Sequence, residues 1–199
     1  MKNKFGFVSL TGRTNVGKST LLNSFFQKKI AITSRKPQTT RNRILGILSE
    51  KDSQIVFLDT PGVHLGYKRQ LNKVMNKIAS HCYEEVDLVL FLIDRLKWQK
   101  EEENILNSLK TLNKPVVLVI NKIDRLKDKT KLLAFIKDIS QKFNFLSIIP
   151  ISALKKDNLL ELKKIILNNL DSGPFHFPDD SITEFSDNFY ISEIIREKA

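Results

Sequence analysis

The sequence predicts an α/β fold, namely a doubly wound and mostly parallel sheet with one antiparallel edge strand and helices around it. Apolar runs of strand length alternate with amphipathic runs of helical length, and the loops between them are short. Four polar or glycine-containing motifs, at residues 12–19, 59–62, 121–124 and 152–153, each follow an apolar run. In a parallel sheet this places all four at the carboxyl edge, where such folds bind their ligands.

The composition indicates one cytoplasmic domain with a tail. The chain has 199 residues, 41% of them hydrophobic, and its longest apolar run is of strand length rather than membrane-spanning length. A single cysteine, Cys82, excludes an internal disulfide and fits a reducing compartment. The net charge of +11 suits nucleic acid or an anionic membrane surface, although the scattered lysines fit a compositional bias of the genome equally well.

The first motif is a phosphate-binding loop between a strand at residues 5–10 and a helix at residues 21–26. Its pattern, G-x-x-x-x-G-K-[ST], is carried by Gly12, Arg13, Thr14, Asn15, Val16, Gly17, Lys18, Ser19 and Thr20. The glycines let the backbone curl so that its N–H groups cradle an anion at the start of the helix. We expect Lys18 to reach the β- and γ-phosphates and the Ser19 hydroxyl to bind Mg²⁺.

Residues 27–46 form a polar and basic loop that contains two adjacent threonines, Thr39 and Thr40. A threonine after a phosphate-loop helix can place its hydroxyl on Mg²⁺ and its N–H on the γ-phosphate, which orders the loop only with a triphosphate. The position of this loop directly after the phosphate-loop helix therefore favours a nucleotide switch over a plain connector rich in serine and threonine.

Strands at 44–48 and 55–58, joined by a polar turn at 49–54, predict an antiparallel hairpin at the sheet edge. The second strand leads into the nucleotide-binding stretch Asp59, Thr60, Pro61, Gly62 and Val63. A carboxylate at the end of a buried strand needs a cationic partner, and Mg²⁺ held through water suits Asp59. Gly62 can bring its N–H to the γ-phosphate, so residues 61–71 form a second predicted switch.

The second half of the chain continues the alternation. We expect helices at 70–82, 100–112, 129–143 and 158–169, and buried strands at 86–93, 115–120 and 146–149. Trp98 is expected to be a packing residue.

Asn121, Lys122 and Asp124 follow the strand at 115–120 in the pattern N-K-x-D. An ionised Asp124 can accept hydrogen bonds from guanine N1–H and the 2-amino group, and adenine offers neither donor. Asn121 can bridge guanine N7 and the phosphate loop, while the Lys122 stem can lie on the ring face. In the loop of Ser152 and Ala153, the Ala153 N–H would favour a carbonyl at O6. A strand-end turn with a salt bridge is the alternative, and the upstream phosphate loop favours guanine.

The predicted reaction is hydrolysis of GTP to GDP and phosphate by an attacking water. Lys18, Mg²⁺ and backbone donors would stabilise its charge-rich transition state. Val63 stands where Ras-like enzymes have a glutamine that orients this water, so we expect slow intrinsic turnover. The Asn15 side-chain oxygen is a candidate to help hold a monovalent cation, K⁺, beside the phosphates.

Several stretches resemble the Era family of bacterial ribosome-assembly GTPases, P-loop GTPases of the TrmE-Era type. They read G-R-x-N-V-G-K-S-T-L-L-N, I-T-S-R-K-x-Q-T-T-R, D-T-P-G-V-H, N-K-I-D and P-I-S-A, and the closing S-E-I-I-R-E-K is similar to the start of the family's second domain. The resemblance implies that Thr40 is the switch threonine on Mg²⁺. It also implies 16S rRNA and the small ribosomal subunit as partners, cytoplasmic location and peripheral contact with the inner membrane. We expect a monomer.

Two departures from the family affect the expected organisation. Thr14 stands where the family usually has proline, which changes loop rigidity and little else. The family's KH domain, whose G-x-x-G loop clamps single-stranded RNA, does not follow Ala199. We therefore expect an Era-type GTPase domain at 1–171, a linker at 172–188 and the start of a missing KH-like domain at 189–199.

The resemblance to the family leaves alternatives open. The chain is a fragment, a truncated gene product or a GTPase without its RNA reader. The alternative function is a guanine-nucleotide switch module that acts through protein or membrane partners without binding RNA. An ATP-using P-loop enzyme is disfavoured by Asn121 and Asp124.

Overall fold

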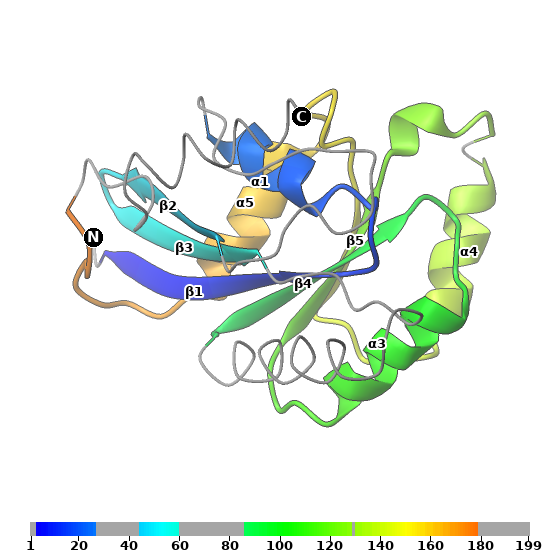
Figure 1. Cartoon of the computed structure of the whole chain (residues 1–199), viewed down its shortest axis with the longest axis horizontal. Coiled ribbons are helices and arrows are strands. Elements are labelled where there is room, and N and C mark those ends of the chain that lie inside the picture. Colours follow the sequence, from blue (N-terminus) through cyan, green and yellow to red (C-terminus); the bar gives the residue numbers. More distant parts are fainter. Residues whose placement is uncertain (1–2, 27–43, 60–85, 129, 179–199) are drawn as a thin grey trace, which may run out of the picture.

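The computed structural model describes residues 3–26, 44–59, 86–128 and 130–178. A six-stranded sheet in the order β2-β3-β1-β4-β5-β6 forms the middle layer (Figure 1). The strands are β1 (Lys4–Thr11), β2 (Ile44–Glu50), β3 (Ser53–Asp59), β4 (Leu88–Asp94), β5 (Val116–Asn121) and β6 (Ser147–Pro150). The helices are α1 (Lys18–Phe25), α3 (Lys100–Lys110), the 3₁₀ turn η1 (Ile123–Arg125), α4 (Thr130–Ser140) and α5 (Leu159–Asn168).

The predicted mixed sheet is confirmed. β2 pairs with β3 in the antiparallel sense at one edge, and every other neighbouring pair is parallel. The parallel registers place Leu10 opposite Asp59 and Asp94 opposite Asn121. The carboxyl ends of these strands therefore meet at one edge, as expected for a ligand-binding edge.

Each face of the sheet has its own apolar core, because successive side chains of a strand point to opposite faces. Helices α1 and α5 cover one face, and α3 and α4 cover the other (Figure 1). All seven residues of β4 are buried, as the continuous apolar run predicted for a central strand. The helix residues buried in the two cores are Leu21, Leu22, Leu159, Leu162 and Ile166 on one face and Ile105, Leu106, Leu109 and Ile139 on the other.

The hairpin turn is shorter than the sequence predicted. The ladder continues through the Ser49–Gln54 and Glu50–Ser53 pairs, so the turn is only Lys51 and Asp52. The prediction ended the strands where their side chains become polar, but backbone pairing does not require apolar side chains. Gln54, expected in the polar turn, is fully buried in β3.

Residues 172–178, the described part of the expected linker, lie against the amino ends of the strands. The Gln54 amide holds this segment: Nε2 donates to Phe177 O (2.9 Å), and Oε1 accepts from His176 N and Phe177 N (both 3.1 Å). The His176 ring stacks on Phe5 with centroids 4.3 Å apart, and Phe177 packs on the core that α3 and α4 cover. Phe177 therefore anchors this segment on the domain surface, and the His176 ring adds a stacking contact.

Several predicted features lie outside the described residues. They are the switch loop with Thr39 and Thr40, the stretch from Thr60 to Val63 with the second switch, the helix at 70–82 with Cys82, and the expected start of a second domain at 189–199. Trp98 is a packing residue as expected, with its ring 5.9 Å from that of Phe91 in an edge-on contact. Within the described segments, no helix combines the length and the apolar character needed to cross a membrane.

Candidate nucleotide-binding site

The phosphate loop leaves β1 after Thr11 and needs glycine at both ends of its curl. Gly12 has φ +143°, and a Cβ there would lie 2.4 Å from Leu92 O in β4. Gly17 has φ +102°, and a Cβ there would lie 2.3 Å from Asn121 Nδ2. Both positions therefore combine a left-handed backbone with a close approach that no side chain tolerates. The loop therefore packs directly on β4 through Gly12 and on the end of β5 through Gly17.

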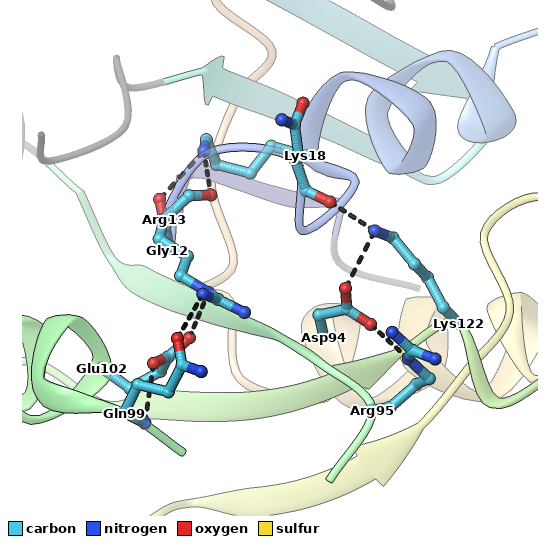
Figure 2. A network of polar contacts seen from close by, with 9 residues as sticks. Gly12, Arg13, Lys18, Asp94, Arg95, Gln99, Glu102 and Lys122 are labelled. Carbon is cyan, nitrogen blue, oxygen red and sulfur yellow. Dashed lines mark hydrogen bonds and ion pairs between the residues drawn. The ribbon is translucent and has the colours of Figure 1, made fainter. Parts of the chain in front are cut away.

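Lys18 lies over the loop rather than pointing into solvent. Its side chain is mostly buried, and Nζ donates to Gly12 O (2.9 Å) and Arg13 O (3.1 Å) (Figure 2). Lys18 and Ser19 also occupy the first turn of α1, which carries no acidic residue. The dipole of this helix makes its first turn positive. Loop, ammonium and helix end together can bind the phosphates of a nucleotide.

Asn121 joins the phosphate loop to two other motifs. This residue is 1% exposed at the end of β5, and its Nδ2 donates to Val16 O (2.8 Å). Its Oδ1 accepts from Lys122 N (2.8 Å) and from Ala153 N (3.0 Å). One side chain thereby fixes three loops relative to one another. Its bridge to the phosphate loop agrees with the sequence prediction, whereas the bond from Ala153 N was not anticipated.

The side chain of Lys122 makes a second link, from the loop after β5 to the phosphate loop and to the end of β4. It has the left-handed φ of 63°, and Nζ donates to Asn15 O in the phosphate loop and to Asp94 Oδ2 (3.2 Å). Arg95 Nε donates to the other oxygen of Asp94 at 2.8 Å (Figure 2). Burial alone would raise the pKa of Asp94, but the Arg95 hydrogen bond and the Lys122 charge outweigh it and lower the pKa. Asp94 is therefore a carboxylate that holds the Lys122 ammonium in place.

Asp124 lies beside the loop that follows β6. Its Oδ1 accepts a 2.6 Å hydrogen bond from the Ser152 hydroxyl, and Ser152 Oγ accepts one from Lys155 N (3.1 Å). Ser152 is fully buried, whereas Asp124 is exposed. A buried hydroxyl thus orients an accessible carboxylate, which can then accept donors from a ligand.

Arg13 connects the loop to the first turn of α3. Its Nη1 donates to Gln99 Oε1 (2.7 Å), and Nε lies 2.6 Å from Glu102 Oε1 as an ion pair (Figure 2). Glu102 is fully buried, and its Oε2 accepts from Gln99 N (2.9 Å) at the start of the helix. This is a capping box, in which a side chain at the third helical position satisfies the N-cap backbone.

The donor set at this edge fits magnesium. Asp59 ends β3, and Ser19 lies in the first turn of α1. Carboxylate and hydroxyl oxygens are ligands that Mg²⁺ prefers, with phosphate oxygens and water completing its shell. The described segments contain no cluster of three or more His, Cys, Asp and Glu that could hold a metal by protein ligands alone. Such a donor set suits a cation that arrives with a phosphate group.

The described residues of the four predicted motifs meet at one edge, with direct bonds joining the first, third and fourth. Thr40, Thr60, Pro61, Gly62 and Val63 lie outside the described residues, and their roles stay predictions. Sequence reasoning missed four residues of the site: Asp94, Arg95, Gln99 and Glu102. Asp94 carried the same signal as Asp59, an acid closing an apolar strand. Gln99 and Glu102 carried only the three-residue spacing of a capping box.

Comparison with known proteins agrees with this geometry. The family model for 50S ribosome-binding GTPases matches residues 7–122. GTPase Era of Haemophilus influenzae is 51% identical over 193 residues, covering 97% of this chain and 64% of the relative. GTPase Era of Pasteurella multocida is 48% identical over 97% of this chain and 63% of its own length. The chain therefore spans just under two thirds of the length of these relatives.

Two solved structures share the fold closely. An Era variant from Aquifex aeolicus bound to GDP·AlF₄⁻ superposes with a TM-score of 0.92 at 44% identity, covering 98% of this chain and 66% of that one. Era in complex with MgGDPNP and nucleotides 1506–1542 of 16S ribosomal RNA gives a TM-score of 0.93 at 44% identity, covering 98% and 67%. Together with the phosphate loop and the motif joined to it through Asn121, these matches show that the chain belongs to the family of 50S ribosome-binding GTPases and is similar to GTPase Era.

Proposed function

We propose that the chain is a GTP-binding and GTP-hydrolysing switch protein, resembling Era, that acts in assembly of the small ribosomal subunit. The observation that carries the nucleotide part is the set of bonds made by Asn121 to Val16 O (2.8 Å) and Ala153 N (3.0 Å). These bonds join the loop suited to phosphates with the loops suited to a base. A site whose two halves are held together in this way is preorganised for a whole nucleotide.

Guanine is the base that the residues fit. The Asp124 carboxylate, oriented by the Ser152 hydroxyl, would accept from guanine N1–H and the 2-amino group. The Lys122 stem would lie on the ring face, because Nζ is held by Asn15 O and Asp94. The Ala153 N–H already donates to Asn121, so its contact with guanine O6 would be a shared hydrogen bond. Adenine would leave the Asp124 carboxylate without its donors.

In the proposed reaction water attacks the γ-phosphate. Lys18 would exchange its bonds to the loop carbonyls for the β- and γ-phosphates, and with Thr40 and Gly62 it forms the proposed catalytic set. Mg²⁺, when bound by Ser19, Thr40 and, through water, Asp59, supplies charge neutralisation at the phosphates. Val63 has no group to orient water, so we expect slow intrinsic turnover. Asn15 is the proposed contact for K⁺ beside the phosphates, because it is an exposed loop residue with a positive φ of 60°.

The proposed RNA partner is 16S rRNA in the small ribosomal subunit. It is supported by similarity to Era, one structure of which contains 16S ribosomal RNA, and by the net charge of +11. We keep the proposed organisation of a GTPase domain at 1–171, a linker at 172–188 and the start of a KH-like domain at 189–199. Cytoplasmic location, peripheral contact with the inner membrane and a monomeric state are further proposals, and they rest on the family resemblance and the charge alone.

Competition for a fluorescent GDP tests the nucleotide assignment. GTP and GDP should displace it, whereas ATP should not. Asp124→Asn should weaken guanine nucleotides and favour xanthine nucleotides, because xanthine presents a carbonyl where guanine has its amino group. Asp128→Asn is the matched control, an exposed acid that lies nearby and also accepts hydrogen bonds, there from Thr130. Displacement by ATP, or unchanged GDP affinity in Asp124→Asn, would refute guanine specificity.

Binding to the 3′ end of 16S rRNA tests the second half of the proposal. It should be measured with a non-hydrolysable GTP analogue and with GDP over a range of salt concentrations. Tight binding that requires the GTP analogue supports an rRNA-directed switch. Weak binding that ignores the nucleotide and vanishes with salt supports the alternative, a switch module that works through protein or membrane partners.

A further inference from the structure

Arg13 links the phosphate loop to α3. This helix lies on one face of the sheet, whereas α1, into which the loop leads, lies on the other face. The loop continues into α1, which packs on one core, whereas α3 packs on the other. Arg13 reaches the start of α3 through two contacts, Nη1 to Gln99 Oε1 at 2.7 Å and Nε to Glu102 Oε1 at 2.6 Å. The loop is therefore attached to both layers of helices.

Glu102 is fully buried, and its place in the capping box does not account for this burial. An acid at the third helical position completes a capping box equally well on the surface. Glu101 and Glu103 share the first turn with Glu102 and are only partly buried, so proximity to the helix end does not require burial. A fully buried carboxylate is costly unless it is paired and hydrogen-bonded. Gln99 N donates a hydrogen bond to one oxygen of Glu102, and the other oxygen has no hydrogen bond among the described residues but lies 2.6 Å from the Arg13 guanidinium as an ion pair. The positive charge of Arg13 is therefore what offsets the burial of this carboxylate.

The backbone of Arg13 takes part in holding Lys18. Lys18 Nζ donates to the carbonyl of Gly12 at 2.9 Å and to that of Arg13 at 3.1 Å. These carbonyls belong to the first half of the loop. The second half is held separately, through Val16 O and Asn121 at 2.8 Å. Without the Arg13 contacts, the first half of the loop would keep its approach to β4 at Gly12 but lose its attachment to α3.

We propose that Arg13 and Glu102 are a positioning pair, which holds the first half of the phosphate loop in the shape that retains the β-phosphate. The inference rests on the proposed guanine-nucleotide site and adds α3 to its supporting structure. Because a phosphate loop cradles the β-phosphate, loss of the pair should weaken GDP and spare GMP, which has no β-phosphate. A pair that only stabilised the fold would affect both nucleotides alike or neither.

The test uses the full chain and three variants. Glu102→Gln removes the charge at nearly constant shape, and Arg13→Lys keeps the charge but loses the planar fork that serves Gln99 and Glu102 together. Glu103→Gln is the matched control, because it makes the same charge change one residue further along, where the carboxylate accepts from Trp98 and faces Lys142. Dissociation of fluorescent GDP and competition by GDP and GMP are measured well below each melting temperature.

We expect Glu102→Gln to speed GDP dissociation by about tenfold and to lower the ratio of GDP to GMP affinity by a similar factor. Arg13→Lys should change both quantities in the same direction by about threefold, and Glu103→Gln by less than about twofold. Should Glu102→Gln fail to fold, Arg13→Lys decides the matter. An unchanged affinity ratio in the folded variants overturns the inference, even where melting temperatures fall. Failure of the unaltered chain to bind GDP would instead refute the proposed nucleotide site.

Discussion

Replacing Asn121 by alanine should destabilise the protein before any nucleotide is added. The side chain makes three hydrogen bonds in a site that is 1% exposed, to Val16 O, Lys122 N and Ala153 N. Each bond contributes about 1 kcal/mol, and buried groups left without a partner keep their full desolvation cost. We therefore expect a loss of about 3 kcal/mol in the free energy of unfolding. For a domain of this size that corresponds to a fall of about 6–12 °C in Tm.

Urea unfolding of the nucleotide-free chain measures this loss. Asn107→Ala is the control, because Asn107 is exposed on α3 and should cost less than about 0.5 kcal/mol. Adding GDP should stabilise the unaltered chain by mass action and stabilise Asn121→Ala far less, since the variant loses binding as well as structure. A loss below about 1 kcal/mol without nucleotide would refute the idea that Asn121 already joins the three loops in the free protein.

Three further predictions address the surrounding contacts. Asp94→Asn should cost about 1 kcal/mol at pH 7, because Lys122 and Arg95 each lose their ion pair with Asp94. The pKa of Asp94 is lowered in the folded state, so its contribution is present above the unfolded value of about 3.9 and is lost as the pH falls through the lower folded value. Acid titration of unfolding should accordingly show the two curves converging below about pH 4, and a difference that persists there would contradict the assignment. Gly17→Ala should lose fluorescent GDP binding and cost at least about 1 kcal/mol in urea, since φ is +102° and the new Cβ would lie 2.3 Å from Asn121; wild-type affinity would show that the loop can adapt. Gln54→Ala should cost about 2 kcal/mol and speed chymotrypsin cleavage after Phe175, because the released segment loses its hydrogen bonds to Gln54; an unchanged cleavage rate would mean that other contacts hold it.

Much of the fold follows from local patterns in the sequence. Strand-length apolar runs alternating with helical periodicity predicted the sheet, because burial on both faces requires apolar residues throughout a central strand. The short polar turn at 49–54 predicted the antiparallel edge, because it leaves room only for a hairpin. The spacing of Gly12, Gly17 and Lys18 predicted the phosphate loop, since only glycine adopts the backbone of those two turns without strain. Asn121 and Asp124 predicted the element that contacts the base, because the hydrogen-bonding groups of their side chains match those of guanine.

Long-range partners were decided only by the tertiary structure. The sequence placed Gln54 in a polar turn, yet its amide binds the backbone of residues 176–177, which lie 122 and 123 positions away. Arg13 and Glu102 likewise gave no sign of pairing, although each sat in a recognisable local motif. A side chain's partner across the fold depends on how strands are ordered and how helices pack on them. The sequence encodes that arrangement through the whole chain at once, and no short stretch specifies it.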